Sequence, residues 1–192
     1  MDNTENKELF LSTFRKNVQR PGAEKLLAWM ETTDFFTAPA STRFHAAYEG
    51  GLLDHSMNVY NVLISKHFDP ASDDIESFTI VSLLHDLCKA GFYKTELRNR
   101  KSDRGEWEKV PVYTVDDQFP YGHGEKSVYL IERFMRLRTE EAMAIRWHMG
   151  GFDESVKGGS FALAHAFEKY PLAVKLHLSD LEATYLHENR SE

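Results

Sequence analysis

Two apolar stripes of helical period, each carrying a histidine, constrain this chain more than any other feature. Residues on one face of a helix recur every three or four positions. The stretch after Gly51 steps by three, four and three along one stripe: Leu52, His55, Val59 and Val62. A later stretch repeats this spacing: Phe78, Val81, His85 and Cys88. The pattern predicts two buried helices that each carry a histidine into the interior.

Helical periods also dominate most of the remaining sequence. We expect helices over residues 5–18, 51–69, 72–90, 124–137, 139–148, 160–168 and 171–187, with one more that has Pro21 in its first turn. Ser72 or Asp73 is the expected N-cap of the central helix, which Gly91 ends, and Thr139 is the expected N-cap of a later one. No repeat or linker divides the chain, so residues 1–192 are expected to form a single, mostly α-helical domain.

Residues 92–118 differ from the rest because they are rich in aromatic and β-branched side chains. Two such runs, 92–97 and 107–115, flank a turn-like stretch over 101–105, which predicts a small β-hairpin inserted between helices. Pro111 requires an edge position in that hairpin. The hairpin is interpreted as a cover for the core or a subunit contact. The alternative is a lid whose aromatic residues stack on a base: Tyr93, Trp107 and Tyr113.

Charge and composition exclude several classes of protein. The formal net charge is -7, from 23 Lys and Arg against 30 Asp and Glu, whereas a broad grip on nucleic acid needs clustered positive charge. The single cysteine, Cys88, excludes an internal disulfide and a Cys-rich zinc module. The N-terminal residues are polar and no apolar run is long enough to span a membrane, so we expect a cytoplasmic protein.

An aspartate inside an apolar segment points to a metal. Asp86 follows His85 among leucines, and a buried carboxylate without a partner is costly. A divalent cation held by this pair and by histidines from packed helices would offset that cost. Asp180 is similar, since it borders another apolar stripe: Val174, Leu178, Leu181 and Tyr185. Each histidine alone has a simpler interpretation as a hydrogen-bonded core residue.

The ordered set His55, His85-Asp86 and Asp180 resembles the HD superfamily of metal-dependent phosphohydrolases. The segment 84–89 resembles the HD-x-x-K form of its motif, and 45–55 resembles the approach to the first ligand in bacterial 3′–5′ exoribonucleases of the superfamily. The resemblance spans residues 43–186, preceded by N-terminal helices in 1–40. It implies an all-α bundle and one to two divalent metals, Mn, Fe, Co, Ni, Zn or Mg, with these ligands: His55, His85, Asp86, His123, His148 and Asp180.

Other polar residues receive roles around that centre. Lys89 lies three residues after Asp86, on the same helix face, and is expected to contact the scissile phosphate as a catalytic residue together with Asp86. His45 and Arg146 are weaker candidates for substrate binding. Cys88 is interpreted as packing and His177 as support for a ligand. The remaining histidines are assigned to the surface: His67, His165 and His187.

The resulting hypothesis is a phosphohydrolase that cleaves a phosphoester bond of a nucleotide or short oligonucleotide. Four histidines and two carboxylates carry a charge of about -2, which two divalent cations would reverse, so that the site attracts phosphate. The metals would activate water and offset charge in the transition state. One alternative is an exonuclease that acts on long single strands, although the chain is too short to include the OB-fold domain that the exoribonucleases carry. Another is an HD domain that binds a nucleotide or a protein without cleavage. A homo-oligomer is compatible with the sequence.

Overall fold

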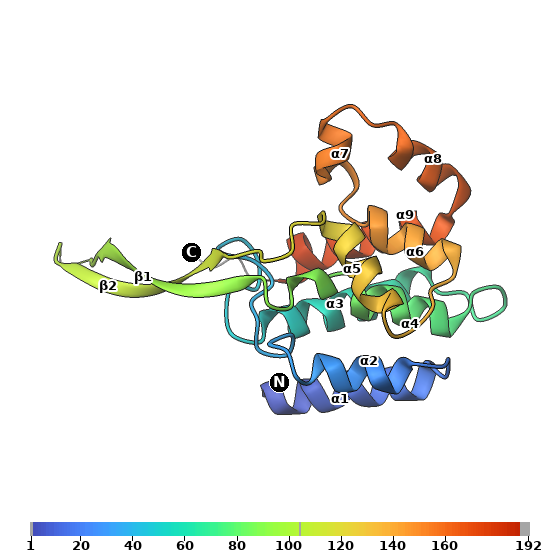
Figure 1. Ribbon diagram of the computed structural model, residues 1–192, viewed down its shortest axis with the longest axis horizontal. Coiled ribbons are helices and arrows are strands. Elements are labelled where there is room, and N and C mark those ends of the chain that lie inside the picture. Colours follow the sequence, from blue (N-terminus) through green and yellow to red (C-terminus); the bar gives the residue numbers. More distant parts are fainter. Residues whose placement is uncertain (1, 104, 189–192) are drawn as a thin grey trace.

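A computed structural model describes residues 2–103 and 105–188 (Figure 1). The chain is mostly helical with one two-stranded antiparallel hairpin, which confirms the predicted mainly-α fold class. The α-helices are α1 Asn3–Asn17, α2 Ala23–Met30, α3 Gly51–His67, α4 Ile75–Leu84, α5 His123–Glu132, α6 Thr139–Trp147, α7 Glu154–Lys157, α8 Ala162–Lys169 and α9 Pro171–Glu182. Short 3₁₀ helices follow α4 and α6, at Leu87–Lys89 (η1) and Gly150–Phe152 (η2), and a π-helical segment, Ala183–His187 (η3), continues α9.

The helices form layers around one apolar core. In Figure 1, α1 and α2 lie along the lower side, α3 and α4 occupy the middle, and α5, α6 and α9 lie above them. α3 packs against α4 and α9, and α6 packs against α5 and α9. The fully buried side chains of the core come from most of these elements: Phe10, Phe14, Leu27, Leu53, Leu83, Ile145 and Leu176. Both apolar stripes that carry histidines are therefore part of this core, as expected.

The predicted end of the central helix is wrong. α4 ends at Leu84, and the chain continues through a turn at His85 and Asp86 into η1 before Gly91, whose φ is +66°. The predicted caps of this helix are also wrong, because the side chain of Asp74 accepts a hydrogen bond from the backbone of Glu76. The early end matters because it frees the His-Asp pair from the fixed angular spacing of helix neighbours.

Other helix boundaries shift by a few residues. Pro21 precedes α2 instead of entering its first turn, since Gly22, with φ +95°, is the N-cap. Thr139 is the first residue of α6, and Arg138 is its N-cap. α5 ends about a turn earlier than expected, and the last predicted helix divides into α9 and η3. The short elements α7 and η2 were not predicted.

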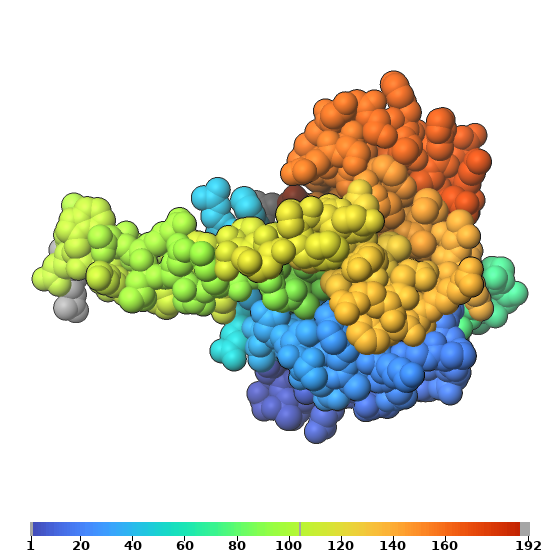
Figure 2. Space-filling view, viewed as in Figure 1, coloured from blue at the N-terminus to red at the C-terminus, as the bar shows by residue number. Residues whose placement is uncertain are grey.

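The predicted hairpin is confirmed, as strands β1 Tyr93–Lys101 and β2 Trp107–Val115. Tyr93 pairs with Val115 and Leu97 with Pro111 in its antiparallel register. Figures 1 and 2 show the hairpin as an arm that projects from the helical body. Trp107, near the far end, is 73% exposed, so this half of the arm does not cover the core. Arg104, in the predicted turn, lies outside the described residues.

Within residues 2–103 and 105–188, no helix combines the length and the apolar character needed to cross a membrane.

Candidate metal centre

Helix ends deliver most of the predicted ligands to one place. His55 comes from the first half of α3, Asp86 follows the C-terminus of α4, and His123 opens α5. His148 is the C-cap of α6 and Asp180 lies in the last turn of α9. All six predicted metal ligands therefore meet in one cluster, with His85 beside Asp86.

The Asp86 carboxylate lies at the centre of the cluster. It is 2% exposed, and each of its oxygens faces a different pair of histidines. Oδ2 lies 3.6 Å from His55 Nε2 and 3.5 Å from His85 Nε2. Oδ1 lies 2.8 Å from His123 Nε2 and 3.5 Å from His148 Nε2. One carboxylate thus joins two neighbouring groups of donor atoms.

The first group has the spacing of a four-coordinate metal site. His55 Nε2 lies 3.2 Å from His85 Nε2 and 3.2 Å from Asp180 Oδ1, in addition to its 3.6 Å separation from Asp86 Oδ2. Metal–N and metal–O bonds of about 2.1 Å at tetrahedral angles place neighbouring donor atoms about 3.4 Å apart. The distances from His55 Nε2 to the other three donor atoms are close to that separation, and His55, His85 and Asp180 together could hold a cation.

The outer nitrogen of three histidines is held by the protein. His85 Nδ1 donates to the Ser82 carbonyl at 2.8 Å and His148 Nδ1 donates to the Ile145 carbonyl at 2.7 Å. His55 Nδ1 lies 2.9 Å from Glu188 Oε1, and this carboxylate oxygen accepts a hydrogen bond from the ring. Such partners fix the tautomer and the ring orientation of metal-binding histidines. Each ring is left with Nε2 facing the Asp86 carboxylate.

Buried ring nitrogens without suitable partners also favour a cation. His148 is 1% exposed, yet its Nε2 forms no hydrogen bond among the described residues. His55 Nε2 and His85 Nε2 lie 3.2 Å apart, so without a metal a proton on His55 has to bridge them, at a position where a cation could bind instead. Buried polar atoms normally have partners. Groups of donor atoms in this cluster could therefore hold a divalent cation.

The pKa values of neighbouring groups in the cluster are shifted in opposite directions. Burial lowers the pKa of His85 to about 3, which keeps the ring neutral and its Nε2 lone pair available. Burial also opposes the charge on His55, but Asp180 and Glu188 outweigh it and raise that pKa to about 10. Burial would raise the pKa of Asp86, yet Lys89 and the histidines hold it well below its usual value. Asp86 is thus an anion at neutral pH.

Lys89 is part of the cluster and not a surface residue. Its Nζ donates to Asp86 Oδ2 at 2.6 Å, and the residue is 9% exposed. Burial opposes its charge, but the nearby Asp86 outweighs that effect and raises the pKa of Lys89 above its usual value. A positive charge therefore lies beside the carboxylate that the two groups of donor atoms share.

The cluster forms the floor of a cavity of about 640 Å³. Its walls carry aromatic side chains from four segments of the chain: Phe44, Phe92, Tyr93, Phe152 and Tyr185. Tyr93 is the one member of the predicted aromatic lid that lines this cavity, and its hydroxyl donates to the Ala40 carbonyl. Of the apolar stripe beside Asp180, Leu181 and Tyr185 line the cavity, while Leu178 is 47% exposed, so this stripe does not form core as a whole.

The two predicted substrate-binding residues have different surroundings. His45 lines the cavity with its ring 5.0 Å from that of His55, and its buried Nε2 forms no hydrogen bond among the described residues. Burial and the neighbouring His55 lower the pKa of His45 to about 4. Arg146 is instead held by other side chains, with Nη1 2.7 Å from Asp153 and a further ion pair to Glu125. The structure does not bring Arg146 into the cluster.

The remaining histidines are distributed largely as expected. His177 Nδ1 donates to the His148 carbonyl at 2.6 Å, next to the backbone of a predicted ligand. His165 and His187 are exposed, whereas His67 is half-buried at the end of α3. None of these three lines the cavity.

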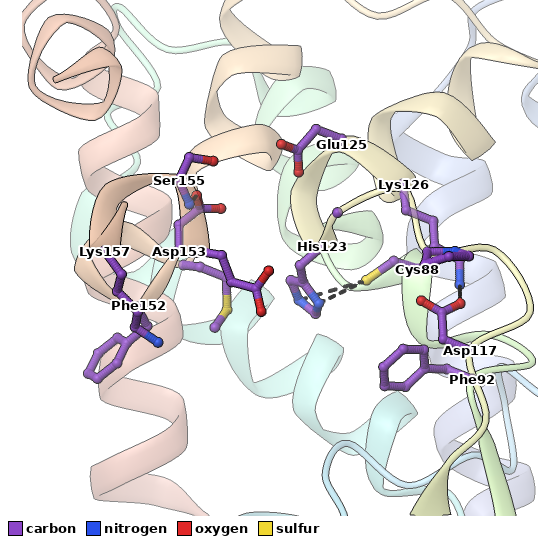
Figure 3. Close-up of a pocket in the computed structure, with 14 residues that line it drawn as sticks. Cys88, Phe92, Asp117, His123, Glu125, Lys126, Phe152, Asp153, Ser155 and Lys157 are labelled. Carbon is purple, nitrogen blue, oxygen red and sulfur yellow. Dashed lines mark hydrogen bonds and ion pairs between the residues drawn. The ribbon is translucent and has the colours of Figure 1, made fainter. Parts of the chain in front are cut away.

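A second cavity of about 610 Å³ lies on the other side of His123 (Figure 3). His123 approaches His148 because α5 and α6 are in close contact: a Cβ added at Gly124 would collide with the Arg146 carbonyl oxygen. The His123 and His148 ring centroids are 5.1 Å apart as a result. A glycine after His123 is thus required for the second group of donor atoms.

Glu188 is the functional residue that sequence reasoning missed. Besides its contact with His55, its Oε1 accepts a hydrogen bond from Asn58 at 3.2 Å. In the sequence, Glu188 is only an acidic residue just after the last predicted helix, a position where exposed side chains are common. The π-helical turn of η3, which places Glu188 beside α3, has no sequence signature that we recognise.

Known proteins add no assignment to this geometry: no family model matches the chain, no curated protein matches it, and no solved structure matches it.

Proposed function

We propose that the protein is a metal-dependent phosphohydrolase of the HD type, which cleaves a phosphoester bond of a nucleotide or a short oligonucleotide. The observation that carries this proposal is the Asp86 carboxylate, whose two oxygens face separate histidine pairs on the floor of a cavity. A carboxylate shared in this way is suited to two neighbouring cations. Two-metal centres are a recurring arrangement in phosphatases and nucleases.

The charge of the centre supports a phosphate substrate. With neutral histidines, Asp86 and Asp180 contribute about -2, which two divalent cations would convert to about +2. Cations bound there would supply activation of water and stabilisation of the charge on a phosphoryl group. The protein as a whole carries -7, so positive charge would be concentrated in the cavity.

Lys89 and His45 can act on the substrate from the cavity wall. The Lys89 ammonium is held at the shared carboxylate, from which it can reach the phosphate or the leaving oxygen and stabilise developing charge. His45 presents an unpaired, buried Nε2 beside His55, where it can accept or donate a hydrogen bond to a substrate oxygen. Both residues would orient the substrate phosphate, and neither belongs to the first set of metal-donor atoms.

The size and lining of the cavity favour a small nucleotide. A volume of about 640 Å³ falls within the usual range for small-molecule sites. Phe44, Phe92 and Tyr93 provide flat surfaces on which a base can stack. A processive exonuclease would need many phosphate contacts outside the centre, which the acidic composition does not favour.

The test is metal analysis of the purified protein, followed by a screen of nucleotides and oligonucleotides with each divalent metal in turn. Asp86→Asn preserves the side-chain shape and should lose both activity and most of the metal. Asp103→Asn, an exposed position near the hairpin turn, is the matched control and should behave as wild type. Activity of wild-type magnitude in Asp86→Asn would contradict the proposal.

A length series of single-stranded substrates at two salt concentrations separates this activity from the exonuclease alternative. We expect a preference for mononucleotides or very short oligomers and a KM that changes little with salt, because few phosphates are contacted outside the centre. A strong rise of kcat/KM with length, together with a steep salt dependence, would favour the exonuclease. Nucleotide binding without turnover under any metal would favour a non-catalytic domain.

A further inference from the structure

We propose that Cys88 is a metal ligand, which makes the second position of the centre a mixed site of one thiolate, two histidines and one carboxylate. This inference rests on the proposed metal centre and assigns Cys88 a role beyond packing. Cys88 Sγ lies 3.4 Å from His123 Nδ1 and 3.7 Å from His123 Nε2. Figure 3 shows the sulfur directed at the His123 ring.

The spacing of the donor atoms fits a thiolate-containing site. Metal–S bonds of about 2.3 Å and metal–N bonds of about 2.1 Å place tetrahedral neighbours about 3.6 Å apart. The separation of Cys88 Sγ from His123 Nε2 is 3.7 Å. One donor atom from each of Asp86, Cys88 and His123 lies within 4.8 Å of the others. The three side chains can therefore share one cation after small movements.

A second observation points to the same position. His148 Nε2 is buried and unbonded among the described residues, and it lies 3.5 Å from Asp86 Oδ1. That oxygen is also the one that contacts His123 Nε2, at 2.8 Å. Because His148 Nδ1 already donates to a backbone carbonyl, its ring is oriented with Nε2 toward this oxygen. His148 Nε2 thus faces the carboxylate oxygen that Cys88 and His123 would share, while its own donor group is with His85 and Asp86.

The local backbone holds the sulfur in place. Cys88 lies in η1, and its N–H donates to Ser127 Oγ at 3.0 Å, which ties this turn to α5. His123 begins the same helix. The residue also lines the second cavity, which gives a metal ion or solvent a route to it. The thiol proton leaves to solvent as the sulfur–metal bond forms.

The two positions would then differ in metal preference. The first has only nitrogen and oxygen donors, from His55, His85, Asp86 and Asp180. A thiolate selects softer cations, so the second position should prefer zinc or cobalt over manganese or magnesium. Loss of the sulfur should lower zinc affinity at this position by at least about 10-fold, since even removal of an outer partner of a ligand lowers metal affinity that much.

Cobalt(II) titration of the metal-free, full-length protein tests this inference. Cys88 is the single cysteine of the chain, so a thiolate-to-cobalt charge-transfer band in the near ultraviolet can come from no other residue. We expect the band in wild type and its loss in Cys88→Ser, with the visible bands of cobalt at the first position retained. The exposed His165→Ala control should keep both sets of bands.

The wild-type spectrum decides the question even if a variant folds poorly, and Cys88→Ala, checked by circular dichroism, serves as a second variant. Cobalt binding in wild type without the charge-transfer band would overturn the role of Cys88 and leave the proposed phosphohydrolase intact. Absence of any cobalt binding would overturn both. A band that persists in Cys88→Ser and Cys88→Ala would also overturn the inference.

Discussion

The charged clusters around Arg20 and around Asp86 differ in how many of their polar atoms have hydrogen-bond partners among the described residues. Around Arg20, Glu141 accepts two hydrogen bonds from the guanidinium, at 2.7 and 2.9 Å, and is 0% exposed. Further bonds come to it from Ser77 and from the backbone of Arg138. Around Asp86, by contrast, histidine nitrogens face one another and one of them has no hydrogen bond among the described residues.

The difference indicates two purposes. The Arg20 cluster joins α4 to α6 and to the segment before α2, and it contains positive and negative groups that match one another. Its role is to hold helices together. The Asp86 cluster gathers histidine and carboxylate donor atoms that could hold a metal. A change to one cluster should therefore leave the other intact, and metal removal should have the largest effect.

Removal of metal should affect only the Asp86 cluster. Treatment with a chelator is expected to abolish phosphohydrolase activity and to lower Tm, because cations bound to the folded state stabilise it. Addition of the preferred metal should restore both. Activity assays and thermal unfolding before and after chelation provide the measurement. Full activity in protein shown to be free of metal would contradict the account.

Glu141→Gln should act only on stability. The buried carboxylate at position 141 loses its charge while Arg20 keeps its ion pair with Glu76, so we expect a loss of about 1–3 kcal/mol in the free energy of unfolding. The measurement is denaturant unfolding of the metal-free protein. The metal content of the folded variant should match that of wild type, whereas a loss of metal would mean that the two clusters are coupled.

Lys89→Ala should separate catalysis from metal binding. Loss of one electrostatic donor is expected to lower kcat by about 10²–10³-fold while the metals are retained. Steady-state kinetics together with metal analysis provide the measurement. Lys66→Ala, at an exposed ion pair, is the matched control and should leave both unchanged. Wild-type turnover in Lys89→Ala would exclude the proposed role.

Glu188→Gln should have the smallest effect in this series. The carboxylate positions His55 through Nδ1 and does not itself face Asp86. Loss of such a partner typically lowers metal affinity or activity by about 10–100-fold. Metal affinity should fall mainly at the position that contains His55, which a competition titration can resolve. Unchanged affinity at that position would return Glu188 to a purely structural role.

The sequence is informative where a residue type conflicts with its surroundings. His55 and His85 on apolar stripes, together with Asp86 among leucines, point to a metal, whereas His123 and His148 were placed in the cluster only through the resemblance to the HD superfamily. The hairpin follows from its aromatic and β-branched runs. The end of α4 at Leu84 was not predictable, because the apolar period continues through Cys88. The turn there is set by tertiary contacts of the His-Asp pair itself, which periodicity does not report.

Contacts between distant segments account for the other omissions. Glu188 lies 133 residues from His55 in the chain, and Cys88 lies 35 from His123. Neither pair has a local spacing that would connect its members. Arg146, which the sequence assigns to substrate binding, forms ion pairs with Glu125 and Asp153 that its sequence position does not reveal. Side-chain partners across helices decide such roles.

The most direct test of the central claim is the number of metal ions per chain in three proteins: wild type, His123→Ala and Asp86→Asn. If Asp86 joins two positions, wild type should bind about two divalent ions and His123→Ala about one, while Asp86→Asn should lose most of both. Circular dichroism should show that all three are folded. Retention of the wild-type metal content by Asp86→Asn would contradict the account.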